Sequence, residues 1–319
     1  MIAMKKELKS LEDGKDEFLT DCKIRNLSQN TIHNYDECFG YFINFVNNNF
    51  KKVNVRQDIK KEILDQYIIK MKDKGIKDTT INIRIRAIRC VLYYFMRNKY
   101  IEEFKISEIK ETSQGIKLYT DNEIKKLLKK PNIKKCTFAE YRTWAIVNFF
   151  VATGVRSRSL RNVRIEDLDF DNELIYIRVT KNRKLVIVPM GKAIKKVLLE
   201  YLRIRGGEKR DFLFCNLEGE QLTKNALNNL ITKYNHKRGV ETTRIHSFRH
   251  YFAKQYIQNG GNVFKLQKIL GHSSIQETQR YVDLFGSDLQ VGFDEVSPLD
   301  NICSYKERIK MKVGWIWER

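Results

Sequence analysis

The chain has 319 residues, 42% of them hydrophobic, with 60 Lys or Arg against 39 Asp or Glu, a formal net charge of +21. The hydrophobic content is enough for packed cores and favours folded domains over disorder, and the length predicts two domains plus a short tail. The charge predicts a polyanionic partner, because Lys and Arg displace the counterions of nucleic acid. No apolar run approaches the roughly 20 residues of a membrane-spanning helix, and no signal peptide opens the chain. We therefore expect a cytoplasmic, nucleoid-associated protein with no membrane partner.

The cysteines are scattered along the chain and form no C-x-x-C pair. In a cytoplasmic protein of this size, such a pattern predicts reduced thiols rather than disulfides or zinc ligands. The six positions are Cys22, Cys38, Cys90, Cys136, Cys215 and Cys303.

The N-terminal third predicts a charged extension, residues 1–14, and a helical domain, residues 15–104. Ser28 precedes a helix whose apolar residues recur at three- and four-residue spacing and which ends at residues 47–49. A second helix is predicted from Ile63 to Gly75. A third begins at Asp78 and carries an apolar stripe to residue 95.

Three arginines of the third helix, Arg84, Arg86 and Arg89, lie off its apolar stripe. They could be a solvated face, but the overall charge favours a basic stripe that binds DNA phosphates. Residues 105–117 lack periodicity and predict a linker between domains.

The second half predicts an α+β domain, residues 118–290. Thr120 and Glu123 have capping-box spacing at the start of a helix. Residues 144–151 are apolar nearly all round and predict a buried helix, which Gly154 ends. Arg156 follows directly, and its alternative interpretation is an arginine that only caps the helix.

A strand, a turn and a second strand are predicted next. The β-rich runs 174–179 and 185–188 flank residues 180–184, with Lys181 at the tip. Lys181 could equally belong to an ordinary charged turn. Helices follow over residues 192–204 and 223–235.

The densest set of reactive side chains lies near residue 250. His246 and Arg249 form an H-x-x-R pattern on a helix that Ser247 is expected to cap, and His272 and Tyr281 follow. Each of these residues alone is weak evidence for a site. A tyrosine such as Tyr281 in an amphipathic helix, for example, is usually a core residue. Together with Arg156 and Lys181 they suit a phosphate, because arginine offers fixed donors to phosphate oxygens. With no acidic cluster or Gly-rich phosphate loop nearby, we expect no cofactor and no metal. His250 is expected to be a structural hydrogen-bonding histidine.

The ordered set resembles the tyrosine recombinase (phage integrase-type) family, whose catalytic domain carries Arg, Lys, His-x-x-Arg, His or Trp, and Tyr. The matches lie in Ala-Thr-Gly-Val-Arg156, at Lys181 by its distance to Pro189, and in Leu-Gly-His272-Ser-Ser, over a resemblance from about residue 15 to 285. One position departs, because Ser159 stands where the family has an acid. The matched residues are Arg156, Lys181, His246, Arg249, His272 and Tyr281.

The resemblance implies a fold that is mainly α with a small β-sheet: a helical core-binding (SAM-like) domain and an α+β catalytic domain. It implies site-specific recombination through a 3′-phosphotyrosyl intermediate and a Holliday junction, by a tetramer on two double-stranded DNA sites. Tyr281 would be the nucleophile, His246 its base, Lys181 the general acid, and Arg156, Arg249 and His272 the phosphate ligands. ATP and metal are not required.

Two alternatives remain open on sequence alone. One is a type IB topoisomerase-like enzyme, and the other is a catalytically inactive DNA-binding accessory protein, which the serine at position 159 would suit. Integrase, dimer resolvase and transposase are not separated. A tail, residues 291–319 with Trp315 and Trp317, is expected to pack on its own domain or in trans.

Overall fold

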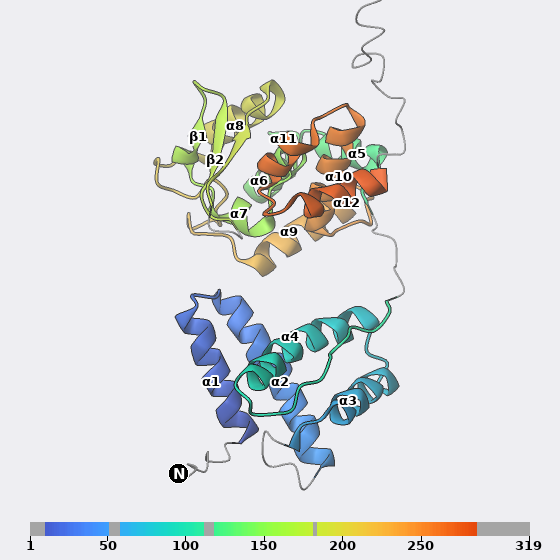
Figure 1. Cartoon of the computed structure of the whole chain (residues 1–319). Helices are drawn as coiled ribbons and strands as arrows, with labels where there is room; N and C mark the ends of the chain where they lie inside the picture. The colour runs from blue at the N-terminus through green and yellow to red at the C-terminus, as the bar shows by residue number, and fades with distance from the viewer. Residues whose placement is uncertain (1–9, 51–57, 112–117, 181–183, 286–319) are drawn as a thin grey trace, which may run out of the picture. The chain divides into compact units, whose positions relative to one another are not determined.

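The computed structural model describes residues 10–50, 58–111, 118–180 and 184–285; Figure 1 shows the elements along the chain. Within α12, nothing is described of the side chains of residues 280 and 282–285. The backbone contacts divide the chain into two compact units, Met1–Gly115 and Ile116–Arg319. The boundary falls inside the segment predicted as a linker. The tail with its two tryptophans lies outside the described residues.

The N-terminal unit is helical, and its core is built from aromatic and branched aliphatic side chains. Ser28 caps the second helix by accepting a hydrogen bond from the backbone N–H of Thr31, so this helix begins where it was predicted. The first helix was not predicted: it begins at Leu11, inside the expected extension, because Ser10 and Asp13 form a capping box there. The helices are α1 (Leu11–Ile24), α2 (Gln29–Asn49), α3 (Lys61–Asp73) and α4 (Asp78–Arg97).

Residues 105–111, which we call the strap, follow α4 without regular structure and pack on it. Ile106 of the strap is buried in the N-terminal core. Asn82 of α4, itself 1% exposed, donates to the Ile109 carbonyl at 2.8 Å and to Glu111 at 2.7 Å. The Ile109 N–H donates back to the Asn82 side-chain oxygen at 2.9 Å. The first half of the predicted linker is therefore attached to the N-terminal unit.

The C-terminal unit combines helices with one small antiparallel sheet in the order β1-β2-β3. Leu174 pairs with Pro189 and Ile177 with Val186, which fixes the register of the predicted hairpin. The described unit is mainly helical with a three-stranded sheet, so the predicted fold class is confirmed. Its elements are α5 (Asp121–Leu128), α6 (Phe138–Thr153), α7 (Ser157–Asn162), η2 (Ile165–Asp167), β1 (Leu168–Asp169), β2 (Leu174–Ile177), β3 (Val186–Pro189), α8 (Lys192–Arg205), α9 (Lys224–Lys237), α10 (Ile245–Gln258), α11 (Val263–Leu270) and α12 (Ile275–Phe285).

Helix α6 runs through the core of this unit and delivers the chain to the site. Its residues from Trp144 to Phe150 are buried apart from Asn148, which is half-buried. Gly154 ends the helix at φ 60°, where a Cβ would come within 2.5 Å of the Phe252 ring. Only glycine fits this turn. The turn sets Arg156 as the residue that precedes α7.

The start of α10 differs from the prediction. Its N-cap is Arg244, and Ser247 lies buried inside the first turn instead of capping it. His246, Arg249 and His250 therefore all lie in the first two turns of one helix.

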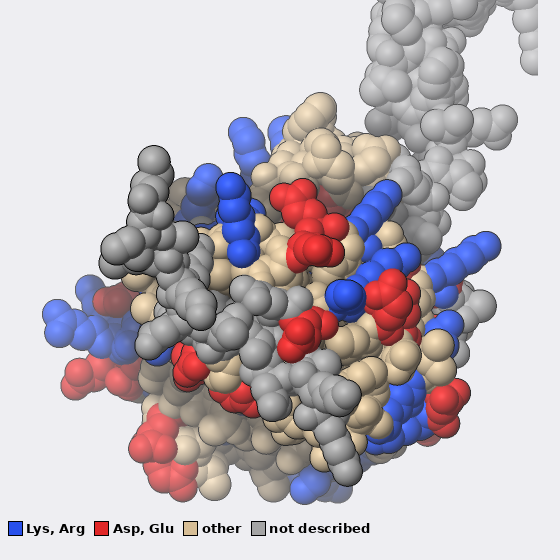
Figure 2. Space-filling model, turned by 60° about the horizontal axis from the view of Figure 1, so that its bottom comes forward, with Lys and Arg blue, Asp and Glu red and all other residues tan. Residues whose placement is uncertain are grey.

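Charged side chains of both signs share the face of the molecule that Figure 2 shows. On the face in Figure 2, Lys and Arg side chains alternate with Asp and Glu side chains. None of the described helices is long and apolar enough to cross a membrane. The five cysteines within the described ranges are unpaired, and Cys303 lies outside them.

Candidate active site

Two arginines distant in sequence meet at one backbone oxygen. Arg249 of α10 donates to the carbonyls of Gly154 at 3.0 Å and Leu270 at 2.7 Å. Arg156 donates to the same Leu270 carbonyl at 3.4 Å. Arg249 is 3% exposed, and burial lowers its pKa to about 10, so it remains charged at neutral pH. The end of α11 thus holds two guanidinium groups side by side.

His272 follows directly, after Gly271 has ended α11 in the left-handed conformation. Its Nδ1 lies 2.7 Å from the hydroxyl of Thr278, which is fully buried. Burial, with Arg249 and Arg156 nearby, lowers the pKa of His272 to about 3. The ring is therefore neutral, and the Thr278 contact fixes its orientation and leaves Nε2 for a ligand.

Tyr281 of α12 is buried, and its ring lies between two imidazoles. The His250 ring is 5.4 Å away between centroids, and the His272 ring is 6.1 Å away and parallel. Burial raises the pKa of Tyr281, and the charge of Arg249, together with a hydrogen bond to it, opposes that shift. The phenol is therefore protonated at neutral pH and needs a proton acceptor before it can attack.

His246 lies against His250, with the two rings edge to face at 4.7 Å. The pKa of His246 falls to about 4, chiefly through burial by the surrounding protein and then through His250 and Arg249. His246 is exposed to solvent, and its lowered pKa leaves a neutral ring able to accept a proton.

Ser159, which stands where the family has an acid, braces the helix that follows Arg156. It is 6% exposed, and its hydroxyl donates to the Val179 carbonyl at 2.8 Å. This bond ties α7 to the segment that follows β2. Lys181 itself lies outside the described residues. The structure thus brings together Arg156, His246, Arg249, His272 and Tyr281 around α10, α11 and α12.

The family model described as "Phage integrase family" matches residues 117–287. The chain belongs to the phage integrase family. The predicted tyrosine recombinase family is confirmed, and with it the class of enzyme.

Curated relatives extend over nearly the whole chain. It is 28% identical over 298 residues to tyrosine recombinase XerC of Thermodesulfovibrio yellowstonii, covering 88% of this chain and 95% of that protein. It is 25% identical to tyrosine recombinase XerA of Pyrococcus furiosus, covering 90% and 95%.

Solved structures of the family share the fold. The Tn1549 transposon integrase in complex with transposon right end DNA has a TM-score of 0.69 at 19% identity, covering 86% of this chain and 94% of that one. The XerH site-specific recombinase bound to a palindromic difH substrate has a TM-score of 0.65 at 22% identity, covering 90% and 85%.

The arginines predicted to contact DNA in the N-terminal unit have partners in their own chain. Arg86 pairs with Glu108 at 2.9 Å, and Arg89 pairs with the same carboxylate at 3.2 Å. Arg84 lies over the Tyr41 ring at 4.5 Å from its centroid. Glu108 belongs to the strap, so the strap neutralises part of the predicted basic stripe.

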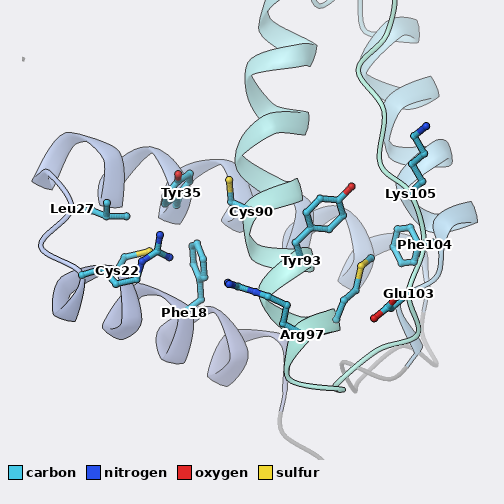
Figure 3. Close-up of a pocket in the computed structure, with 12 residues that line it drawn as sticks. Phe18, Cys22, Leu27, Tyr35, Cys90, Tyr93, Arg97, Glu103, Phe104 and Lys105 are labelled. Atoms are coloured by element: carbon cyan, nitrogen blue, oxygen red, sulfur yellow. The ribbon is translucent and has the colours of Figure 1, made fainter. Parts of the chain in front are cut away.

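A cavity of about 800 Å³ opens elsewhere in the N-terminal unit, between α1, α2 and α4 (Figure 3). Phe18, Tyr35, Tyr93 and Phe104 supply aromatic walls, and Arg97 points across it. It contains none of the family's catalytic residues.

Sequence reasoning missed two residues of the site. His250 was expected to be hydrogen-bonded, but its Nδ1 is buried and has no hydrogen-bond partner in the described part of the chain. Glu277 was not singled out, although it lies 3.7 Å from Arg156 and 3.8 Å from His272. Its place one helical turn before Tyr281 was a signal that could have been used.

Proposed function

We propose that the protein is a site-specific DNA recombinase that cleaves and rejoins DNA through a 3′-phosphotyrosyl intermediate. The observation that carries the proposal is the meeting of Arg156 and Arg249 at the Leu270 carbonyl, beside His272 and Tyr281. The names of the relatives, XerC and XerA tyrosine recombinases, support the same activity.

Arg156, Arg249 and His272 bind the scissile phosphate. A phosphodiester gains negative charge on its non-bridging oxygens in the transition state, and donors fixed in advance stabilise that charge. The two guanidiniums are oriented by carbonyls, and the imidazole by Thr278, so these three donors need little reorganisation of their own when the phosphate arrives.

Tyr281 attacks phosphorus, forming the O–P bond as the bond to the 5′-oxygen breaks. Its proton passes to His246, which is neutral at physiological pH because burial and its cationic neighbours lower its pKa. Rejoining reverses these steps with the 5′-hydroxyl of another strand, and the phosphotyrosyl bond conserves the energy.

Lys181 protonates the leaving 5′-oxygen. This role comes from the family resemblance, and the Ser159 hydrogen bond to Val179 supports it by bracing the chain just before Lys181 in the sequence. The serine therefore does not favour the inactive accessory protein.

Residues 15–104 form the core-binding half and residues 118–290 the catalytic half, which together hold double-stranded DNA. Arg84, Arg86 and Arg89 contact the DNA backbone once the strap's carboxylates are displaced. Four protomers on two sites exchange strands through a Holliday junction. The complexes of the Tn1549 integrase and XerH with DNA support the DNA partner.

A covalent-trap experiment tests the proposal. Wild-type protein is incubated with fragmented DNA from its own host, denatured in SDS, and the DNA that stays attached is sequenced. We expect adducts at defined sites, which then serve as nicked trapping substrates. Tyr281→Phe should abolish the adduct, whereas Tyr251→Phe, on the neighbouring helix α10, should retain it. An adduct that survives Tyr281→Phe would refute the nucleophile, and relaxation of any plasmid without site preference would favour a topoisomerase.

A further inference from the structure

Helix α12 brings a carboxylate into the group of cations that awaits the phosphate. One Glu277 oxygen lies 3.7 Å from the Arg156 guanidinium and 3.8 Å from His272 Nε2. Arg249 and Tyr281 also feel its charge, since it raises the pKa of each. The carboxylate therefore lies against Arg156 and His272, two of the side chains that the proposed function assigns to the phosphate.

These contacts do not resemble a structural ion pair. Both distances exceed a direct hydrogen bond, and the Glu277 side chain remains 41% exposed. Its hydroxyl neighbour Ser273 is at the edge of hydrogen-bond range, at 3.5 Å. A loose, half-exposed pair of this kind contributes little to stability, so folding alone gives no reason for an acid at this position.

A carboxylate and a phosphodiester present the same features to this site, a single negative charge and two oxygens. In the proposed function, Arg156 and His272 Nε2 are also among the groups that bind the phosphate. The carboxylate and the phosphate therefore cannot both lie between them without strong repulsion.

We propose that Glu277 is a positioning residue of the phosphate site: in DNA-free protein its carboxylate takes the place of the scissile phosphate between Arg156 and His272, and it leaves when DNA binds. The inference rests on the proposed function for the identity of the phosphate. Glu277 offsets the repulsion between the like charges of Arg156 and Arg249. Because a phosphate must displace its carboxylate, Glu277 also lowers the affinity of the site for phosphate.

The direct test uses inorganic phosphate and DNA-free protein. Glu277→Gln keeps the shape and removes the charge, so phosphate affinity measured by calorimetry at constant ionic strength should rise about tenfold. Unchanged or weaker binding would overturn the proposal. Should Glu277→Gln fail to fold, Glu277→Ser must give the same gain.

A swap variant separates the local contact from net charge. Gln276→Glu combined with Glu277→Gln moves the carboxylate to the exposed neighbouring position and keeps an acid in the first turn of α12, where it favours the helix N-terminus. The swap should retain the gain in phosphate affinity. If it returns to wild-type affinity, overall charge explains the effect and the proposal is wrong.

A nicked trapping substrate gives the second measurement. Glu277→Gln should lower KM about tenfold at fixed salt and change the rate of adduct formation at saturation by less than threefold. A loss of rate at saturation would make Glu277 part of the chemistry and overturn a positioning role. If wild-type protein forms no adduct, the proposed function fails, and the phosphate titration still decides whether Glu277 occupies an anion site.

Discussion

Two pairs of arginines in this protein have the same side chain and opposite surroundings. Arg86 and Arg89 of α4 are partly exposed, and both pair with the Glu108 carboxylate within 3.2 Å. Arg156 and Arg249 are held by backbone carbonyls. The carboxylate of Glu277 pairs with Arg156 only at the longer distance of 3.7 Å.

The two kinds of partner differ in whether they leave the positive charge of the arginine available to bind a phosphate. A carboxylate neutralises an arginine, whereas a carbonyl orients it and leaves its charge in place. The site therefore keeps fixed positive charge in a place with little water, where it stabilises an anionic transition state most. The α4 pair must exchange one anion for another, so its contribution to binding is small.

The largest expected effect is a change of Arg249 to lysine. A lysine cannot donate to Gly154, Leu270 and a phosphate in the same fixed geometry. We expect adduct formation on a trapping substrate to slow by about 10²–10³, with DNA affinity measured separately by filter binding. Arg86→Lys is the matched control and should slow it less than threefold. An equal loss of rate in Arg249→Lys and Arg86→Lys would show that the two pairs of arginines do not differ.

Acid should weaken the fold through His272. Its folded pKa of about 3 lies below the unfolded value of 6.5, so its stabilisation is complete above pH 6.5 and is lost as the pH falls toward 3. The side chain is 4% exposed, and between pH 7 and 5 the free energy of unfolding should fall by about 2 kcal/mol on its account. The free energy of unfolding in urea should fall between pH 7 and 5 by that much more in wild type than in His272→Asn. If the two proteins lose stability equally over this range, the lowered pKa of His272 is contradicted.

Release of the strap should come next in size. Asn82→Ala removes the two-way hydrogen bonding with Ile109 and should lower the free energy of unfolding of the N-terminal unit by about 1–3 kcal/mol. Asn44→Ala, an exposed position on α2, should change it by less than about 0.5 kcal/mol. Similar values for both would mean that the strap is not fixed by Asn82.

The smallest effect concerns the charge on the strap. Glu108→Gln should raise DNA affinity about threefold and steepen its salt dependence by about one counterion, because Arg86 and Arg89 become available to phosphates. Glu102→Gln, exposed and ahead of the strap, controls for net charge. If the two variants behave alike, the basic stripe on α4 does not contact DNA.

Periodicity and capping signals were sufficient for most elements. The buried helix that Gly154 ends, the capping box at Thr120, and the hairpin paired through Leu174 are all present as predicted. These signals are local, so they can be read from a few neighbouring residues. Helix α1 was missed because charged residues dominate its sequence. Its apolar stripe is short, and Leu11, Phe18 and Cys22 are the hydrophobic residues that it buries.

The site could be foreseen as a set of residues but not as an arrangement. Nothing in the sequence relates Arg156 to the Leu270 carbonyl, since a backbone oxygen leaves no mark on composition. The same holds for Asn82, whose partner Ile109 lies 27 residues along the chain. Glu277 and His250 have a meaning only once α10 and α12 are packed together.

The shared contact at Leu270 has an evolutionary consequence. A main-chain oxygen cannot be removed by substitution, so drift at position 270 alters the side chain and spares the acceptor. Gly271 has no such freedom, because a methyl group there would come within 2.6 Å of Val186 in β3. Because the Leu270 side chain is itself buried, position 270 should accept other apolar side chains that fill the same space, whereas position 271 should accept only glycine, when variants of this turn are selected for activity.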